Sequence, residues 1–189
     1  MQKSGRKSIW SGRVRPIQYF DERFDQFWRS VSPNFPIAVA RSAKYLNYRY
    51  IENPRCGRYV CIVAEQASKI VGFIVLSLYD TPHSAYLLEF LIQPGLEAAG
   101  DALLQAVTQI AQSANAAQIY AWCPFHLKNE AALLSANGFV HATSKWMPGD
   151  LRYKQLFLIR KHPSLPSPLN LDANELENWY VSLGDHDYY

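Results

Sequence analysis

The stretch AYLLEFLIQPGLEAAG, residues 85–100, contains the change of periodicity that decides the fold. Its first half, residues 85–92, is a short apolar run that is typical of a strand. The sequence Gln93-Pro94-Gly95 ends this strand, because these residues favour a turn. From about residue 97 to residue 114, apolar side chains recur at the spacing of one helix face. The stretch therefore predicts a strand that passes through a tight turn into a long helix.

The sequence on either side of this stretch predicts a mixed α/β (α+β) domain. Phe20, Phe24 and Phe27 fall on one face of an amphipathic helix, and Asn137-Gly138 is a typical left-handed helix end. In chain order, we expect helices at 20–31 and 41–51, strands at 59–64, 70–78 and 85–92, a helix at 97–114, a strand at 118–123, a helix at 129–136, and strands at 139–146 and 156–160.

The composition is that of a folded protein. Of the 189 residues, 49% are hydrophobic and 19% are charged, which is enough apolar material for a packed core. No apolar run approaches the roughly 18 residues that cross a bilayer. The basic N-terminus is not followed by the apolar stretch of a secretory signal, so we predict a cytoplasmic protein without membrane contact. Cys56, Cys61 and Cys123 show neither a disulfide framework nor the spacing of metal ligands, and no metal site is predicted.

Positive charge is concentrated at the N-terminus. Subtracting the five positive residues before position 16 from the net charge of +3 leaves −2 for the rest of the chain. The body therefore lacks the basic character of a nucleic-acid-binding domain, and the charge argues against such a partner. We divide the chain into a flexible basic lead-in at 1–18 with a short strand near 14–17, a domain at 19–162, and a Pro-rich linker with an acidic, aromatic tail at 163–189.

Three segments resemble a known superfamily. The stretch AALLSANGF, residues 131–139, resembles the point at which a helix ends at x-x-x-G-F and enters the next strand in GCN5-related N-acetyltransferases (GNAT). The predicted element order over residues 20–161 resembles this superfamily as well. The stretch YLNYRYIENP, residues 45–54, and the ending GDHD, residues 184–187, resemble a GNAT-like subgroup associated with polysaccharide biosynthesis.

This resemblance implies a splayed mixed sheet of about six to seven strands flanked by about four helices. Two parallel strands would part and admit acetyl-CoA, or a related acyl-CoA, as the co-substrate. The pyrophosphate of the carrier would rest on the helix N-terminus after the third strand, where N–H groups and the helix dipole favour an anion. The residues expected to bind the carrier are Leu91, Ile92, Gln93, Gly95, Ala98, Ala99, Gly100, Asp101 and Asn129.

Two registers of the family's Q/R-x-x-G-x-G/A pattern are possible in this loop. The match EAAGDA, residues 97–102, has Glu97 where the family has Gln or Arg. The second register uses Gly95, Ala98 and Gly100. The acidic side chains would weaken the binding of a diphosphate. The same stretch also fits an ordinary strand-to-helix turn in which the acids complement the helix dipole.

Transfer of an acyl group to an amine needs a proton acceptor for the amine and a proton donor for the thiolate. Glu89 lies within the apolar strand, where burial would raise the pKa of its carboxyl group and suit it to act as the base. A structural, salt-bridged Glu89 is the alternative. The family's usual tyrosine acid is absent from residues 124–138, so His126 is the candidate, with Cys123 or water as substitutes. Asn129 could bind the carrier or form the N-cap of its helix.

The acceptor is expected between the second helix and the tail. Aromatic faces beside carboxylates suit a small cationic amine, of which an amino sugar is one example. The candidate residues are Tyr45, Asn47, Arg49, Asp185 and Asp187, although aromatic residues at such spacing usually pack in a core.

Three functions remain open from the sequence. The first is an N-acyltransferase that acts on a small amine. The second is a non-catalytic GNAT-like module that binds a partner or ligand, with a homodimer or a second GNAT-like unit as its assembly. The third is a transferase that uses aminoacyl-transfer RNA, against which the net charge of the body argues.

Overall fold

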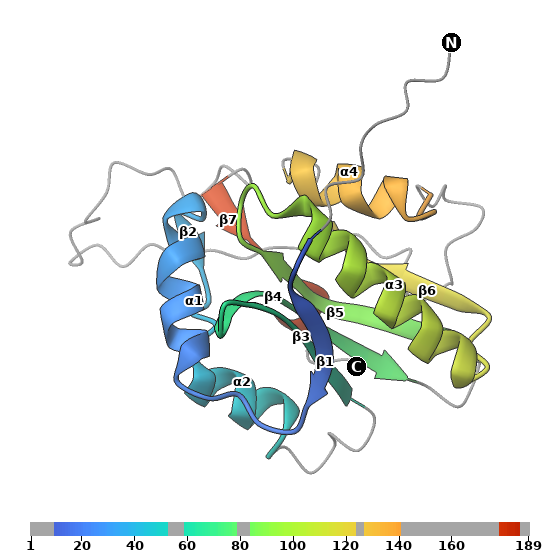
Figure 1. Cartoon of the computed structure of the whole chain (residues 1–189), viewed down its shortest axis with the longest axis horizontal. Helices are drawn as coiled ribbons and strands as arrows, with labels where there is room; N and C mark the ends of the chain where they lie inside the picture. Colours follow the sequence, from blue (N-terminus) through green and yellow to red (C-terminus); the bar gives the residue numbers. More distant parts are fainter. Residues whose placement is uncertain (1–9, 53–58, 79–83, 124–126, 141–177, 186–189) are drawn as a thin grey trace, which may run out of the picture.

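The computed structural model describes residues 10–52, 59–78, 84–123, 127–140 and 178–185. Figure 1 shows a central sheet with helices on both faces. The elements in chain order are β1 (Arg13–Ile17), α1 (Arg23–Val31), η1 (Ser32–Asn34), β2 (Ile37–Ala38), α2 (Ala43–Tyr50), β3 (Tyr59–Gln66), β4 (Lys69–Leu78), β5 (Ser84–Ile92), α3 (Glu97–Ser113), β6 (Gln118–Ala121), α4 (Lys128–Ala136), β7 (Trp179–Tyr180) and η4 (Leu183–Asp185).

Within the described residues, five strands form the main sheet, in the order β1-β3-β4-β5-β6. The first three pairings are antiparallel, and β5 pairs with β6 in parallel. The crossover between β5 and β6 is α3, as expected for parallel neighbours that need a helical connection. Strands β2 and β7 form a separate parallel pair. The predicted mixed α/β class is thus confirmed, and the part of the chain that the structure describes has four α-helices and divides its strands between two sheets.

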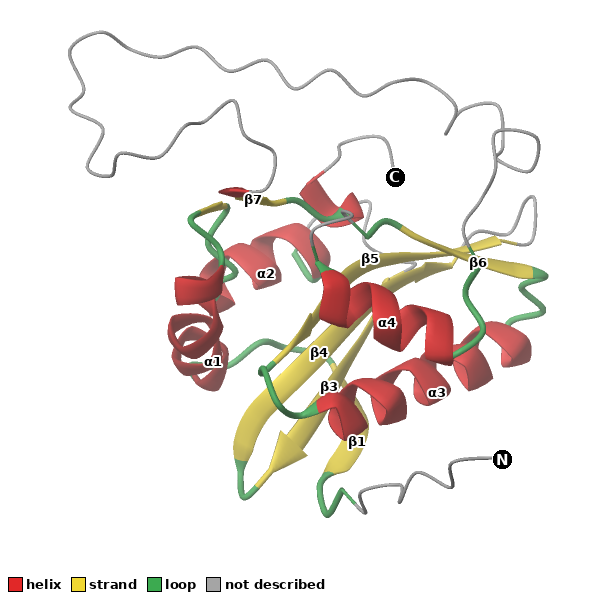
Figure 2. Ribbon diagram, turned by 90° about the horizontal axis from the view of Figure 1, so that it is seen from above, coloured by secondary structure: helices red, strands yellow, loops and turns green. Residues whose placement is uncertain are grey.

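The helices divide the core into two layers. In Figure 2, α1 and α2 cover one face of the sheet, and α3 and α4 cover the other. On the first face, Phe73 of β4 meets the rings of Phe20, Phe24 and Phe27 edge to face, with centroids 5.7 to 6.1 Å apart. On the second face, Leu103, Leu104 and Val107 of α3 are fully buried against the sheet. Both faces therefore exclude water, which explains the continuous apolar sequence of β4 and β5.

The N-terminal strand corrects part of the predicted lead-in. The short strand expected near residues 14–17 is present as β1, but it is paired along its length with β3. Arg13 and Arg15 of this strand donate hydrogen bonds to the Glu65 carboxylate at 2.8 and 2.7 Å. Two of the basic residues assigned to a flexible arm are therefore held by an ion pair. Pro16 is accommodated because β1 is an edge strand, where a missing N–H group is tolerated.

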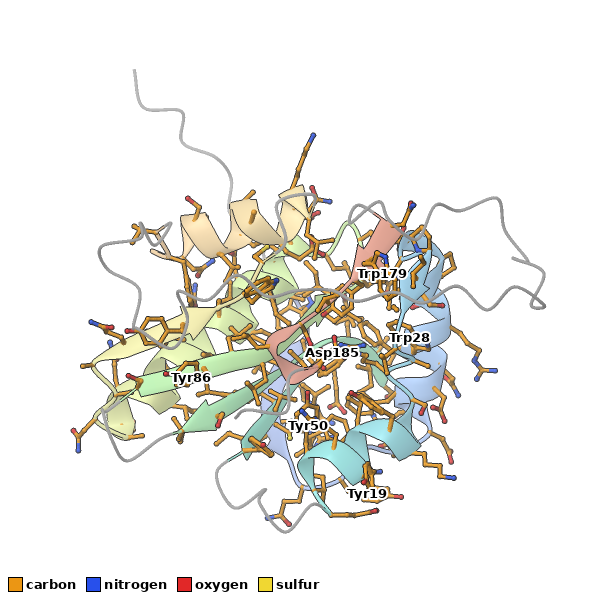
Figure 3. All side chains as sticks on the ribbon, turned by 180° about the vertical axis from the view of Figure 1, so that it is seen from behind. Tyr19, Trp28, Tyr50, Tyr86, Trp179 and Asp185 are labelled. Atoms are coloured by element: carbon orange, nitrogen blue, oxygen red, sulfur yellow. The ribbon has the colours of Figure 1, made fainter. Side chains whose placement is uncertain are left out.

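The C-terminal segment corrects part of the predicted tail. Residues 178–185, which were assigned to an acidic tail, are packed into the first core layer. Tyr180 and Leu183 are buried, and β7 pairs with β2 near the end of α1. Figure 3 shows Trp179 and Asp185 of this segment over the same face of the sheet as Trp28 and Tyr50. We call residues 178–185 the C-terminal segment.

Helix α4 ends at the predicted cap. The strand expected to begin directly after it, at Phe139, does not begin there. Gly138 has a φ of +87°, the left-handed conformation expected for the Asn137-Gly138 cap. Phe139 closes the cap by donating its N–H to Leu134 O at 3.0 Å. Phe139 and Val140 are not part of a strand. The remainder of the expected strands at 139–146 and 156–160 lies outside the described residues.

Candidate functional site

The parallel strands β5 and β6 separate halfway along β5. Their pairing runs from Ser84 and Gln118 to Leu87 and Ala121, whereas β5 continues to Ile92. A pocket of about 20 Å³ opens where the pairing stops, with room for about one water molecule. Its walls come from β5, from the residues after β6, from α4 and from the C-terminal segment. They are Leu87, Leu88, Phe90, Trp122, Cys123, Leu127, Glu130, Leu134, Tyr180, Val181 and Ser182.

A β-bulge determines which way Glu89 points. Opposite β4, Leu76 pairs with Leu87 and Val75 pairs with Glu89, so Leu88 is the extra residue. An extra residue reverses the alternation of side chains along a strand. Leu88 belongs to the core layer of α1 and α2, and the Glu89 carboxylate meets Tyr50 of α2 in the same layer. Without the bulge, the carboxylate would point toward α3.

Glu89 is the centre of a buried polar cluster. Its side chain is 0% exposed. Tyr50 donates its hydroxyl to Glu89 Oε1 at 2.9 Å. Arg41 Nε lies 3.3 Å from the same oxygen and 3.4 Å from Oε2. Arg41 Nη2 reaches Ser182 Oγ at 3.0 Å and Asp185 Oδ2 at 2.5 Å. The cluster therefore joins β5 and α2 to the C-terminal segment.

The charges in this cluster set its ionisation. Burial raises the pKa of Glu89, against the opposing effect of Arg41, and the nearby Asp185 raises it further. Burial alone would lower the pKa of Arg41, but the Glu89 carboxylate, with Tyr180 and Asp185, outweighs it and raises the pKa. The guanidinium also lies 5.0 Å from the centre of the Tyr180 ring, a cation–π distance. Arg41 is therefore a fixed cation beside a carboxyl group that binds a proton more readily than usual.

The loop between β5 and α3 is open at its tip. Gly95 has a φ of +83°, and a Cβ atom there would meet nothing within 4 Å. Helix α3 starts with Leu96 as its N-cap, which makes no side-chain capping bond. Ala99 N–H donates to Leu96 O at 2.9 Å, and the earlier N–H groups of a helix have no partner within the helix. The loop therefore offers the N–H groups and positive dipole of a long helix.

Other residues expected to bind the carrier are part of the packing around this loop. A Cβ atom on Gly100 would lie 3.0 Å from Leu133 Cδ1 and 3.3 Å from Ile92 Cδ1, so Gly100 lets α3 approach α4 and β5. Asp101 accepts a hydrogen bond from Asn137 Nδ2 at 2.8 Å. Leu91, Ile92 and Ala99 are buried, Gln93 and Ala98 are half-buried, and Gln93 N–H donates to Val71 O at 2.8 Å.

Three residues with expected roles, Cys123, His126 and Asn129, lie at or just before the start of α4. Asn129 is exposed at the second position of the helix, and Leu127 is the N-cap, so the prediction of Asn129 as an N-cap is wrong. His126 lies outside the described residues. Cys123 lines the pocket, and burial, together with the charge of Glu130, raises the pKa of its thiol to about 11. Cys123 therefore stays protonated near neutral pH and is a poor nucleophile.

Three of the five expected acceptor residues come together. Tyr45 lies 5.9 Å from the Arg41 guanidinium, Asp185 pairs with Arg41, and Arg49 Nε donates to Gly184 O at 3.0 Å. Asn47 does not join them. Its amide bridges the backbone of Phe20, accepting from N–H at 2.9 Å and donating to O at 2.8 Å. Asp187 lies outside the described residues.

The sequence did not reveal Arg41 or Ser182. Arg41 stands directly before Ser42, the N-cap of α2, in a stretch without a motif. It is 48 positions from Glu89 and 144 positions from Asp185, so no local spacing links them. The only available signal was the Gly184-Asp185 pair, whose place in the fold the sequence left open.

Among the described residues, no group of three or more His, Cys, Asp or Glu side chains is arranged to hold a metal ion. In the same part of the chain, no helix is both long and apolar enough to cross a bilayer.

Comparisons with solved structures identify similar folds. An acetyltransferase of the GNAT family from Staphylococcus aureus Mu50 is 21% identical, with a TM-score of 0.57 over 76% of this chain and 94% of that one. AAC(6')-Iy, in complex with a bisubstrate analogue that contains CoA, has a TM-score of 0.54 at 10% identity over 81% and 99% of the two chains. The ribosomal-protein-alanine N-acetyltransferase from Brucella melitensis biovar Abortus 2308 has a TM-score of 0.55 at 11% identity over 80% and 100%.

The sequence itself matches a family model. A comparison with curated protein sequences found no match. The model of the acetyltransferase (GNAT) family matches residues 24–139, which run from α1 through the cap of α4 and make up more than half of the chain. The chain therefore belongs to the GNAT acetyltransferase family.

Proposed function

We propose that this protein transfers an acetyl or related acyl group from acyl-CoA to a small amine. The observation that carries this proposal is the separation of β5 from β6. Because β5 runs on to Ile92 after its pairing with β6 ends at Leu87, the two strands leave an opening beside the edge of β5. The pocket lies at this opening, and α3 begins directly beyond the end of β5.

The carrier is proposed to bind along the open edge of β5 and at the N-terminus of α3. Its pyrophosphate would meet the first N–H groups of the helix, at the exposed loop around Gly95 and Ala98. Of the two acidic side chains that the sequence places near a diphosphate, Asp101 bonds to Asn137 on α4. Glu97 is exposed in the first turn of α3 and opposes an anion there. The second register, with Gly95 and Ala98 at the anion, is therefore favoured.

Glu89 is the proposed base. The amine must lose a proton before its nitrogen attacks the thioester carbonyl carbon, and the C–S electron pair then leaves with sulfur, which takes up a proton. A carboxylate whose pKa is raised by burial accepts a proton at higher pH than an exposed one does. His126 and water are the candidate proton donors to the thiolate.

The acceptor is proposed to approach Glu89 from the side of α2. Tyr45 lies beside Arg41 there, Arg49 donates to Gly184 O, and Asp185 pairs with Arg41 while residues 178–185 are docked. An amino sugar is one candidate acceptor, supported by the resemblance of residues 45–54 and 184–187 to polysaccharide-associated proteins. The cytoplasm is the proposed location.

Isothermal calorimetry with acetyl-CoA tests the proposal through a matched pair of variants. Gly95→Asp adds a carboxylate at the tip of the loop, and Gly95→Asn adds a neutral side chain of the same shape; both residues tolerate a positive φ. We expect wild type and Gly95→Asn to bind, and Gly95→Asp to bind about tenfold more weakly because of charge repulsion. Equal affinity in the two variants, or no binding to wild type, would contradict the proposal.

A non-catalytic binding module is the second candidate. Two observations favour it: the pocket holds about one water molecule, and Glu89 is fully enclosed. A module of this kind would bind a partner, including a second copy of itself, without turnover. Acetyl-CoA binding without transfer to any amine in a broad screen would support this candidate.

A further inference from the structure

The C-terminal segment reaches the opening where the carrier is proposed to bind. Tyr180, Val181 and Ser182 form part of the pocket wall. The Tyr180 hydroxyl donates to Phe90 O at 3.3 Å. Phe90 lies on β5 beyond the last residue that pairs with β6, so this hydrogen bond uses a backbone acceptor at the opening. The segment therefore accounts for much of the small size of the pocket.

The same segment covers the proposed base. Gly184 is buried against the Glu89 cluster, and a Cβ atom there would lie 2.6 Å from Glu89 Oε1 and 1.9 Å from the Tyr50 hydroxyl oxygen. Only a residue without a side chain allows the backbone to come this close. An amine cannot reach the Glu89 carboxylate while Gly184 is in this position.

A small set of polar contacts holds the segment. Asp185 pairs with Arg41 at 2.5 Å and accepts the Ser182 N–H at 2.9 Å. Arg49 of α2 donates to Gly184 O at 3.0 Å. The strand pairing with β2 covers only two residues, Trp179 and Tyr180. Of these contacts, those made by Arg41 and Arg49 come from the side of α2, where the acceptor is proposed to approach.

One polar atom of the docked segment is unsatisfied. In the described part of the chain, Asp185 Oδ1 is buried without a hydrogen-bond partner. A buried acceptor without a partner costs about 1–3 kcal/mol, which offsets part of what the ion pair contributes. We therefore expect this short, partly unsatisfied attachment to open more readily than the strands of the main sheet.

We propose that the C-terminal segment is an internal occupant of the acceptor site, and that an amine and residues 178–185 compete for the position over Glu89. The inference rests on the proposed function, because it takes Glu89 as the group that the amine must reach. Opening the segment would expose Glu89 and widen the pocket in one step, since the same eight residues cover both.

Access to Glu89 can be measured without any enzymatic activity. The full-length protein is treated with a water-soluble carbodiimide and methylamine, and amide formation at Glu89 is followed over time by peptide mass spectrometry. Gly184→Ala is the main variant, because its methyl group clashes with Glu89 and Tyr50 and displaces the segment. Asp185→Asn is the second, because it removes the charge that pairs with Arg41 without adding atoms. Glu65→Gln is the control, since it weakens the fold at β1 and β3, away from the segment.

We expect coupling at Glu89 to be about tenfold faster or more in Gly184→Ala than in wild type, with a smaller increase in Asp185→Asn and none in Glu65→Gln. Hydrogen exchange of peptides that contain residues 178–185 shows whether each variant has released the segment. Unchanged coupling at Glu89 in a folded variant with a released segment would overturn the proposal, as would rapid coupling in wild type.

Calorimetry with acetyl-CoA on the same proteins separates this inference from the proposed function. If Glu89 becomes accessible in Gly184→Ala but acetyl-CoA binds to neither protein, the acyltransferase assignment is wrong and the covering of Glu89 stands. If acetyl-CoA binds and Glu89 is equally accessible in all proteins, the assignment stands and the internal occupant is rejected.

Discussion

Two buried glutamates, Glu65 on β3 and Glu89 on β5, are both paired with arginine. The pKa of Glu65 is nevertheless lowered, whereas the pKa of Glu89 is raised. Three arginines donate to Glu65, namely Arg13, Arg15 and Arg23. The hydrogen bonds from Arg15 outweigh the effect of burial, and with those from Arg13 and Arg23 they lower the pKa of Glu65 to about 2. Glu89 has one arginine and lies beside Asp185, and burial raises its pKa.

This difference shows that an arginine partner does not by itself lower the pKa of a buried carboxyl group. At Glu65 the arginine side chains remain partly in water, with Arg13 72% and Arg15 38% exposed, so pairing costs little desolvation. At Glu89 both partners are 0% exposed, and the cost of burying charge is large. Glu65 therefore stabilises the fold as an anion at neutral pH, whereas we propose that Glu89, whose pKa is raised by burial, exchanges a proton.

The largest expected effect is on catalysis at Glu89. Glu89→Gln keeps the shape and the hydrogen bond to Tyr50 but cannot accept a proton. We expect the rate of acetyl transfer to fall by about 10²–10⁴-fold, the usual contribution of a general base. In wild type the rate should rise with pH as Glu89 loses its proton, at a pH above the ordinary carboxyl pKa of 4.5. Glu65→Gln is the control. An equal loss of rate in both variants would contradict the claim that Glu89, and not Glu65, is the base.

Among the stability predictions, the largest effect is expected for removing Arg41 from the Glu89 cluster. Arg41→Met leaves Glu89 and Asp185 as buried carboxylates without a cation. We expect the free energy of unfolding to fall by about 3 kcal/mol, the lower end of the cost of breaking a buried pair. Urea titration at pH 7 measures it. A loss no larger than that of Arg13→Met, at an exposed arginine of the Glu65 cluster, would show that the buried pair is not needed.

The contribution of the Glu65 cluster to the free energy of unfolding should decrease at acidic pH. Because the pKa of Glu65 is lowered in the folded protein, its stabilisation is complete above the ordinary value of 4.5 and is lost as the pH falls toward 2. Glu65→Gln should cost about 2 kcal/mol at pH 7, a figure reduced from the full linkage value because the arginines are solvated. The difference between variant and wild type should shrink as the pH is lowered from 5 to about 2.5. Urea titrations of both proteins across this pH range test this prediction. A difference in the free energy of unfolding that does not change with pH would show that it does not arise from the ionisation of Glu65.

The smallest expected effect lies at the loop before α3. Glu97→Gln removes an exposed negative charge from the first turn of the helix. A charge near a helix N-terminus changes binding or stability by about 0.3–1 kcal/mol, so acetyl-CoA should bind about two- to fivefold more tightly. Calorimetry against Gln112→Ala, a change in the last turn of the same helix, provides the control. Unchanged binding by Glu97→Gln would indicate that the carrier does not approach this turn, and weaker binding would contradict the expected repulsion.

Local chemistry determined the elements that the sequence predicted well. Pro94 and Gly95 end β5, Gly138 ends α4, and the apolar face of α3 is continuous, so each was recognisable from neighbouring residues. The position of Glu89 on a buried strand was also predictable. Its orientation was not, because it depends on the bulge at Leu88, which is set by the register against β4.

The rest of the candidate site depends on contacts across the whole chain. Arg41 is 144 positions from Asp185, and the C-terminal segment contacts the core through residues distant in sequence, among them those of β2, α2 and β5. Residues 178–185 mix polar, aromatic and aliphatic side chains, a composition that fits a solvated tail as well as a docked segment. The N-terminal arginines were misassigned for the same reason, since their partner Glu65 lies 50 and 52 positions away.

The most direct test of the central claim is a titration of the two glutamates themselves. Carboxyl chemical shifts of ¹³C-labelled protein can be followed by NMR from pH 2 to pH 8, with Glu65→Gln and Glu89→Gln used to assign the two signals. The account predicts that Glu65 titrates near pH 2 and that Glu89 titrates above its ordinary value of 4.5. A Glu89 that titrates below 4.5, as a permanently ionised partner of Arg41, would contradict the claim that this carboxyl group is held ready to accept a proton.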